Sequence, residues 1–488
     1  MGLPAPPASL IAFLLGAAAV AGFAPLEVFP LPILSLTLLF RQWQQAPRPR
    51  TAAWLGFCWG LGFFLAGVSW VYVSLHDVGG MAAPMAIAAT LAFCAYLAVF
   101  PALVGYGYRR LASADFWRDA LLLAGLWLLA EWLRGWLFTG FPWLALGYAQ
   151  TPPSPLAGYA AVLGSYGIAG LVALIAALLA LAPRRRATWL LIAALFGGGA
   201  LLRGMHWTQP AGPPLGVSLL QGNIPQSLKW EPERLPLSVQ TYVKLARDNP
   251  AALTVLPETA IPLFFDELPR EVLQALTQHG NVLLGMAVRH RDGGYVNGAV
   301  AIAPGGGAQS YAKRHLVPFG EYVPPGFAWF FDYVRIPMSD FSAGPARQPP
   351  LAIAGQKIAP NICYEDLFGE ELLPALPAAT LLVNLSNTAW FGDSLAQPQH
   401  LQIARMRALE TGRMMLRATN TGITAAIAPD GRVLGALPPF TAGALRIEAQ
   451  GFSGLTPYAR WGNALALLLA ICAILPAFMA AYRRRKSR

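Results

Sequence analysis

The chain has 488 residues, of which 56% are hydrophobic and only 12% are charged. Soluble proteins carry about 25% charged residues, so this composition excludes an ordinary soluble protein and indicates a membrane protein. The net charge of +11 could indicate nucleic-acid binding, but the basic residues cluster in short runs at the ends of apolar segments. That distribution is typical of membrane topology, and we expect no nucleic-acid partner.

Eight apolar stretches approach the roughly 20 residues that a membrane-spanning helix needs. Their approximate bounds are 8–25, 28–40, 52–74, 81–107, 117–137, 159–182, 187–203 and 461–482. The sequence therefore predicts a membrane domain of about seven helices over residues 1–205 and a C-terminal transmembrane helix over residues 461–482.

Arginine residues follow every second span. They stand at 41, 48 and 50, at 109, 110 and 118, and at 184, 185 and 186, and the chain ends in a basic run from Arg483 to Arg488. The loops on the other side carry almost no lysine or arginine. Because loops rich in these residues stay in the cytoplasm, both termini are predicted to be cytoplasmic, and the region between the seventh and eighth spans is predicted to lie outside.

The first apolar run has a second interpretation, because Ala17–Ala21 resembles the small-residue cleavage region of a signal peptide. A signal peptide carries a basic segment before its apolar core, and this run has none. We therefore expect the run to be retained as a span.

Residues 213–450 have a different pattern, in which short β-like runs alternate with amphipathic helical stretches. The β-like runs are 215–220, 252–256, 281–288, 298–303, 379–385 and 422–428, and the helical stretches are 233–248, 268–279 and 397–412. This alternation predicts an α/β domain with buried sheets. Asp430–Gly431 is a typical hairpin turn.

Three reactive side chains stand at the ends of apolar, strand-like runs in this region: Glu258, Lys313 and Cys363. A thiolate needs a base and a developing oxyanion needs a cation, so the three are the parts of a covalent acyl-transfer site. Each also has a simpler interpretation. A cysteine that closes an apolar strand is most often core, Glu258 could be a turn residue, and Lys313 could belong to a charged cluster with Arg314.

The other three cysteines, Cys58, Cys94 and Cys472, lie in long apolar runs, where cysteine usually packs as a small apolar residue. No disulfide framework, zinc-ligand spacing or nucleotide motif is visible in the sequence. We therefore expect no metal and no cofactor.

Longer motifs around the three reactive residues resemble those of the nitrilase, or carbon-nitrogen hydrolase, superfamily. They read Leu256-Pro-Glu258-Thr, Tyr311-Ala-Lys313-Arg-His-Leu-Val-Pro-Phe-Gly-Glu321-Tyr and Asn361-Ile-Cys363-Tyr-Glu365-Asp. With the membrane spans and the motifs Glu131-Trp-Leu-Arg134 and Trp390-Phe-Gly-Asp393, the chain resembles the bacterial apolipoprotein N-acyltransferases. The resemblance covers nearly the whole chain, with its motifs in the family's order.

This resemblance implies a nitrilase-like α-β-β-α sandwich over residues 213–450, on the periplasmic side of the bacterial inner membrane. It also implies an activity, the transfer of an acyl chain from a membrane phospholipid to the N-terminal cysteine α-amine of a diacylated lipoprotein. This is the final step of lipoprotein maturation. The two substrates would react in turn, in a ping-pong sequence, through a thioester on Cys363.

The resemblance also implies a role for each site residue. Cys363 would attack the ester, Glu258 would accept protons, and Lys313 with a backbone N–H near the cysteine would stabilise the oxyanion. Four further residues match supporting or substrate-binding positions of the family: Glu321, Tyr364, Glu365 and Trp230. Simpler interpretations of these are a loop carboxylate, a residue paired with a nearby arginine, or an aromatic that packs the domain.

Glu131 and Arg134 are three positions apart on a predicted helix and can therefore face each other. Charges at membrane depth are costly and are usually paired or functional. An internal ion pair and contact with a phospholipid headgroup are both compatible with the pattern.

Two other functions fit parts of the sequence. A membrane-tethered amidase would use the same three reactive residues on small amides, but it would leave seven preceding spans without a purpose. A transporter with an accessory outer domain would need ionisable residues along its route, whereas these spans carry few besides Glu131 and Arg134.

Overall fold

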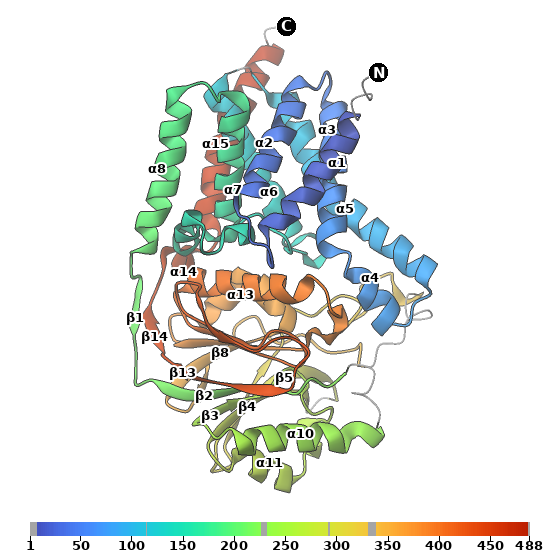
Figure 1. The fold of residues 1–488 in the computed structure, drawn as a ribbon, viewed down its shortest axis with the longest axis vertical. Coiled ribbons are helices and arrows are strands. Elements are labelled where there is room, and N and C mark those ends of the chain that lie inside the picture. Colours follow the sequence, from blue (N-terminus) through green and yellow to red (C-terminus); the bar gives the residue numbers. More distant parts are fainter. Residues whose placement is uncertain (1–6, 114, 226–231, 291–292, 330–337, 487–488) are drawn as a thin grey trace. The chain divides into compact units, whose positions relative to one another are not determined.

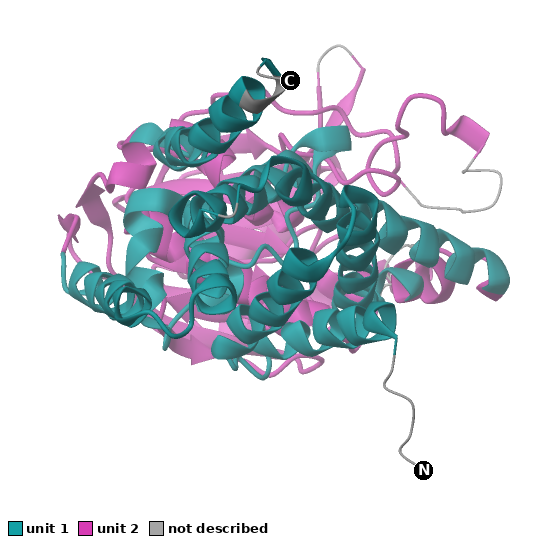
Figure 2. Ribbon diagram, turned by 90° about the horizontal axis from the view of Figure 1, so that it is seen from above, with its two compact units in different colours: residues 1–72, 84–205, 461–488 teal, residues 73–83, 206–460 magenta. Residues whose placement is uncertain are grey.

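The computed structural model describes residues 7–113, 115–225, 232–290, 293–329 and 338–486 of the chain. The chain divides into two compact units (Figure 2). Unit 1 comprises Met1–Tyr72, Pro84–Met205 and Trp461–Arg488, and unit 2 comprises Val73–Ala83 and His206–Arg460.

The helices of unit 1 follow the apolar stretches of the sequence (Figure 1). They are α1 (Ala8–Ala19), α2 (Pro30–Gln45), α3 (Pro49–Val68), α5 (Ala83–Leu111), α6 (Phe116–Arg134), α7 (Ala160–Leu181), α8 (Arg186–Arg203) and α15 (Ala464–Lys486). Each predicted stretch overlaps one of these helices, which confirms the predicted helical membrane domain. Within the described residues, α3, α5, α8, α15 and α7 with its preceding turn are long and apolar enough to cross a membrane.

Glycines allow α1 and α3 to approach closely. A Cβ at Gly16 would lie 1.9 Å from the carbonyl oxygen of Trp59, and a Cβ at Gly62 would lie 2.0 Å from that of Phe13. Small residues at such crossings let two helix backbones meet, which is how helices associate when the surrounding medium is itself apolar.

Glu131 and Arg134 are both buried within unit 1. Arg134 donates to the carbonyl oxygens of Phe141 at 2.5 Å and Trp143 at 2.7 Å. Glu131 accepts the backbone N–H of Leu146 at 3.1 Å. Both charged groups therefore hold the irregular segment that follows α6. The ion pair between the two side chains and the alternative contact with a phospholipid headgroup both stay predictions.

Unit 2 contains two six-stranded sheets. The first has the order β13 (Gly443–Ala449), β2 (Leu215–Gln221), β3 (Leu253–Val255), β4 (Asn281–Arg289), β5 (Tyr295–Ile302) and β6 (Ala308–Ala312). The second has the order β12 (Val433–Ala436), β11 (Ala425–Ile427), β10 (Met415–Thr419), β9 (Leu381–Ser386), β8 (Gln356–Ile362) and β7 (Leu351–Ile353). The inner strands β2–β3–β4 and β8–β9–β10 run parallel. A two-stranded ribbon joins β1 (Thr208–Pro210) to β14 (Phe452–Gly454).

Helices cover the outer face of each sheet (Figure 1). α10 (Leu235–Asp248) and α11 (Arg270–Thr277) pack on the first sheet, and α13 (Ala396–Thr411) packs on the second. A third core, with Leu219, Val255, Leu385 and Leu416 among its members, fills the space between the sheets. The predicted α-β-β-α sandwich is therefore confirmed. Shorter helices are α4 (Val71–Val73), α12 (Gly369–Leu372) and α14 (Pro457–Trp461).

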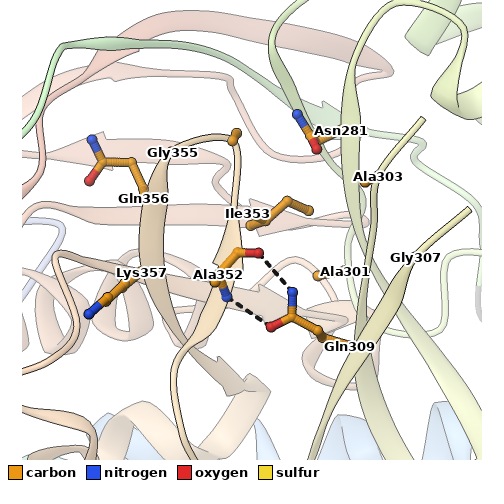
Figure 3. Close-up of a pocket in the computed structure, with 11 residues that line it drawn as sticks. Asn281, Ala301, Ala303, Gly307, Gln309, Ala352, Ile353, Gly355, Gln356 and Lys357 are labelled. Atoms are coloured by element: carbon orange, nitrogen blue, oxygen red, sulfur yellow. Dashed lines mark hydrogen bonds between the residues drawn. The ribbon is translucent and has the colours of Figure 1, made fainter. Parts of the chain in front are cut away.

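At the sheet edges formed by β6 and β7, the side chain of Gln309 links the two sheets. The amide of Gln309 donates to the carbonyl oxygen of Ala352 at 2.7 Å and accepts its N–H at 3.0 Å, as a paired strand would (Figure 3). This pairing borders an open hollow of about 380 Å³, whose lining includes Asn281 and Lys357. None of the reactive residues predicted from the sequence lines it.

Candidate active site

Cys363 stands directly after β8, at the start of a tight turn that runs to Leu367. Its φ is +53°, a left-handed conformation that costs a residue other than glycine about 1–3 kcal/mol. Asn384 of β9 donates to the Cys363 carbonyl oxygen at 3.1 Å, and Glu365 accepts the N–H of Ile362 at 2.6 Å. These neighbours hold the thiol at a strained junction between a strand and a turn, a geometry that presents nucleophiles at strand ends.

Glu258 lies in the turn after β3, and its carboxylate is buried. The oxygen Oε2 accepts the backbone N–H of Asn387 at 2.9 Å. The other oxygen, Oε1, accepts from Asn297 Nδ2 at 2.7 Å and from Lys313 Nζ at 3.4 Å. Because Asn387 follows β9, the carboxylate of Glu258 connects the end of the first sheet to the end of the second.

Gly285 in β4 allows the backbone of Glu258 to approach the strand. A Cβ at position 285 would lie 2.5 Å from the Glu258 Cα and 2.7 Å from the Pro257 carbonyl oxygen. We therefore expect Gly285→Ala to destabilise unit 2 by about 1–3 kcal/mol and to lower its thermal unfolding midpoint. Gly216→Ala in β2 is the matched control, since a Cβ there meets nothing within 4 Å. Equal midpoints for the two variants would contradict this account.

Lys313 follows β6, and its side chain is only 1% exposed. Its Nζ lies 2.8 Å from Glu321 Oε2 and 3.4 Å from Glu258 Oε1. Burial alone would lower the pKa of Lys313, but the negative charges of Glu321 and Glu258 outweigh it and raise the pKa. The amine therefore stays positively charged between the two carboxylates.

Asn297 of β5 joins the same two carboxylates from a second direction. Its Nδ2 donates to Glu258 Oε1 and to Glu321 Oε1, each at 2.7 Å. Glu321 also accepts the N–H of Val317 at 2.8 Å. One ammonium between two carboxylates leaves one negative charge in excess, and these neutral N–H donors stabilise it in a buried setting.

Burial, and next the charge of Glu258, raise the pKa of Cys363 to about 12. The charge of Lys313 and a hydrogen bond with Ser386 act in the opposite direction. The thiol is therefore protonated at neutral pH. A protonated thiol is a poor nucleophile, so Cys363 can react efficiently only if a neighbouring base takes its proton as the new bond forms.

Glu365 is buried beside these groups. Its Oε1 accepts the backbone N–H of Arg314 at 2.7 Å and the hydroxyl of Tyr311 at 2.8 Å. Burial raises the pKa of Glu365, and the N–H of Ile362 opposes this. The carboxylate thus ties the turn after Cys363 to the chain around Lys313.

The structure brings together Glu258, Lys313 and Cys363 with two of the predicted supporting residues, Glu321 and Glu365. Tyr364 is also buried; its ring packs edge-on against Phe368, with centroids 5.1 Å apart. Trp230 lies outside the described residues. The roles assigned to all seven residues stay predictions.

Three polar residues in contact with this site were missed by the sequence reasoning: Asn297, Asn384 and Ser386. Each is a buried polar residue on a strand. The sequence carried a signal for two of them, an amide side chain inside an apolar run: Asn297 follows Val296, and Asn384 lies between Val383 and Leu385. An amide inside an apolar strand must find a partner, and here that partner belongs to the site.

Two protein families match successive parts of the chain. The family described as the Apolipoprotein N-acyltransferase N-terminal domain matches residues 15–178, and the Carbon-nitrogen hydrolase family matches residues 216–450.

Complete relatives match nearly the whole chain. The Apolipoprotein N-acyltransferase of Nitrosomonas europaea is 50% identical over 98% of this chain and 98% of its own length. The enzyme of the same name from Ralstonia nicotianae is 47% identical over 98% of this chain and 94% of its own. Among solved structures, a carbon-nitrogen hydrolase from Helicobacter pylori G27 is 19% identical, with a TM-score of 0.36 over 48% of this chain and 89% of that chain.

Proposed function

Since this chain belongs to the apolipoprotein N-acyltransferase family, we propose that it moves an acyl chain from a membrane phospholipid to the N-terminal α-amine of a diacylated lipoprotein, through a thioester on Cys363. One observation carries the proposal. A buried thiol, a carboxylate and a charged amine meet at the strand ends of a carbon-nitrogen hydrolase domain, in a chain whose other domain consists of apolar helices.

In the first half-reaction, the Cys363 sulfur attacks the ester carbonyl of the phospholipid while Glu258 takes the thiol proton. The C–O bond then breaks, and the departing lysophospholipid oxygen takes that proton from Glu258. The products are a thioester and a lysophospholipid. Moving the proton from sulfur to Glu258 keeps the net charge of the buried site unchanged, which favours this route over prior ionisation of a thiol whose pKa is about 12.

In the second half-reaction, the lipoprotein α-amine attacks the thioester carbonyl and Glu258 takes a proton from its nitrogen. The C–S bond breaks, and the sulfur recovers the proton. An amide forms and the enzyme is restored. The burial of Cys363 limits the access of water, so aminolysis can outrun hydrolysis of the thioester.

Both half-reactions pass through a tetrahedral intermediate with a negatively charged oxygen. Lys313 is the cation for this oxygen, together with a backbone N–H near Cys363. Glu321 and Glu258 raise the pKa of Lys313, so the amine is charged before the substrate arrives and needs no reorganisation. Glu321 and Asn297 hold the amine and Glu258 in fixed relative positions.

The positions of the arginine residues between spans support a multi-pass placement in the bacterial inner membrane, with both termini cytoplasmic and unit 2 periplasmic. Gly305 lies at an exposed turn between β5 and β6, where an added Cβ would meet nothing within 4 Å. A membrane-impermeant maleimide should label Gly305→Cys from the periplasmic side of intact cells. Labelling only after the inner membrane is opened would refute this orientation.

Mass spectrometry of the protein isolated from membranes tests the chemistry. We expect a fatty-acyl adduct on Cys363 that hydroxylamine removes and that a lipoprotein peptide with a free α-amine discharges. An amidase acting on small amides would form no such adduct from phospholipid. If Cys363 stays unmodified after incubation with phospholipid alone, the proposal is contradicted.

A further inference from the structure

A second group of buried ionisable side chains is linked to the backbone of Cys363 and takes no part in the proton transfers above. It consists of Asp366, His400 of α13 and Arg417 of β10, and each is at most 1% exposed. His400 Nε2 lies 2.7 Å from Asp366 Oδ1. Arg417 Nη1 lies 3.0 Å from Asp366 Oδ2, and its Nη2 lies 2.8 Å from His400 Nδ1.

The contacts define the protonation of His400. A guanidinium can only donate hydrogen bonds, so Nδ1 must be the bare nitrogen that accepts from Arg417. Nε2 then carries the hydrogen and donates to Asp366. Burial, and next the charge of Arg417, lower the pKa of His400, so the imidazole stays neutral. The three side chains thus form a directed chain of hydrogen bonds, from guanidinium to imidazole to carboxylate.

Two connections link this group to Cys363. Asp366 belongs to the tight turn that begins at Cys363. Arg417 Nη1 also donates to Asn384 Oδ1 at 3.0 Å, and Asn384 Nδ2 donates to the Cys363 carbonyl oxygen at 3.1 Å. The left-handed residue is therefore connected to Asp366 through the turn and to Arg417 of β10 through Asn384 of β9.

Stability alone is a weak reason for such a group. Removing charges from water is costly, and well-packed apolar residues often replace a buried ion pair without loss of stability. A strained backbone conformation, in contrast, persists only where its surroundings determine it. Cys363 has that conformation, with a φ of +53°.

We propose that Asp366, His400 and Arg417 are positioning residues, which hold the Cys363 peptide in its left-handed conformation and so direct the thiol toward Glu258 and Lys313. This inference rests on the proposed role of Cys363 as nucleophile. None of the three needs to touch substrate. Their effect acts through the orientation of one sulfur atom.

Arg417→Lys and Arg413→Lys form a matched pair for the test. Arg413 is equally buried, but its guanidinium donates to the carbonyl oxygens of Ala379 and Gly454. Lysine keeps the charge in both variants and removes the forked geometry. Two quantities are measured on the full-length protein: the rate at which iodoacetamide alkylates Cys363, resolved by peptide mass spectrometry, and kcat and KM for acyl transfer.

We expect Arg417→Lys to lower both the alkylation rate and kcat by roughly 10- to 100-fold, with KM little changed, because a displaced nucleophile reacts slowly even when substrate binds. Arg413→Lys should keep both rates near those of the unaltered protein, per folded molecule. Equal losses in the two variants, or a normal alkylation rate in Arg417→Lys, would overturn the proposal. The alkylation comparison needs no acyl donor, so it stays informative even if phospholipid proves not to be the substrate.

His400→Leu covers the case in which Arg417→Lys does not fold. Leucine can neither donate to Asp366 nor accept from Arg417, so a loss of about five-fold or more in alkylation rate is expected from the two missing hydrogen bonds. His279→Leu, at an exposed position, is its control. Equal alkylation rates in these two variants would also overturn the proposal.

Discussion

Replacing Cys363 by alanine is expected to lower kcat for acyl transfer by on the order of 10⁵-fold or more, which is the usual scale for loss of a covalent nucleophile. Alanine has no atom that can carry the acyl chain between the two substrates. The variant should lose little folding stability, because the substitution removes only one sulfur atom from a core that otherwise stays intact. The measurement is N-acylation of a diacylated lipoprotein peptide in vesicles containing phospholipid.

Cys472→Ala is the control for the same substitution. Cys472 is exposed on α15 in unit 1, and its loss should leave kcat within about two-fold, since exposed substitutions have small effects. Acyl transfer at a normal rate by Cys363→Ala would exclude the thioester route. A direct attack of the amine on the ester would then have to be considered instead.

Replacing Glu258 by glutamine should lower kcat by on the order of 10³-fold, the range typical of a lost general base. Glutamine has nearly the same shape, so loss of activity would report the missing proton acceptor rather than a cavity. Its amide would also meet the N–H donors of Asn297 and Asn387, and some loss of stability is expected from the mismatched pair. Thermal unfolding of the purified variant would measure that loss separately.

Glu258→Gln should slow acyl transfer but make the Cys363 thiol easier to ionise, which alkylation by iodoacetamide can measure. The negative charge of Glu258 raises the pKa of Cys363, so removing that charge lowers the pKa. The pH profile of iodoacetamide alkylation should therefore shift toward lower pH in Glu258→Gln, although acyl transfer is slower. A shift toward higher pH, or unchanged kcat, would be incompatible with the role proposed for Glu258.

Most of the architecture could be predicted from local patterns of apolar and polar residues in the sequence. The apolar stretches predicted the helices of unit 1, because a span must be apolar along its whole length. In unit 2, runs such as 281–288 and 379–385 became β4 and β9, and the stretch 397–412 became α13. Asp430–Gly431 connects β11 to β12 as the expected hairpin, with a φ of +78° at the glycine.

In two of the missed strands, β10 and β6, polar residues hide the pattern. β10 is entirely buried, yet it contains Arg417, and a charge inside a short run argues against a buried strand in a single sequence. β6 is short and mostly exposed, so only Tyr311 and Ala312, directly before Lys313, indicated a strand. In both cases the strand exists because its neighbours in the sheet satisfy its backbone, which is information that no local window contains.

The candidate site could be predicted only in part for the same reason. Glu258, Lys313 and Cys363 were identified by their positions after strand-like runs and by resemblance. Asn297 and His400 were not, because their partners lie far away along the chain: Asn297 joins Glu258 to Glu321, and His400 joins Asp366 to Arg417. Contacts of this kind depend on how two sheets and a helix meet.

The high pKa of Cys363 has a further consequence, for redox chemistry. Peroxides oxidise thiolates much faster than thiols, and this thiol is both protonated and buried. In an oxidising compartment such as the one proposed for unit 2, an activated cysteine would be lost to sulfenic acid between turnovers. A sulfur that gives up its proton only while a carbonyl is being attacked is protected from that damage without a disulfide partner.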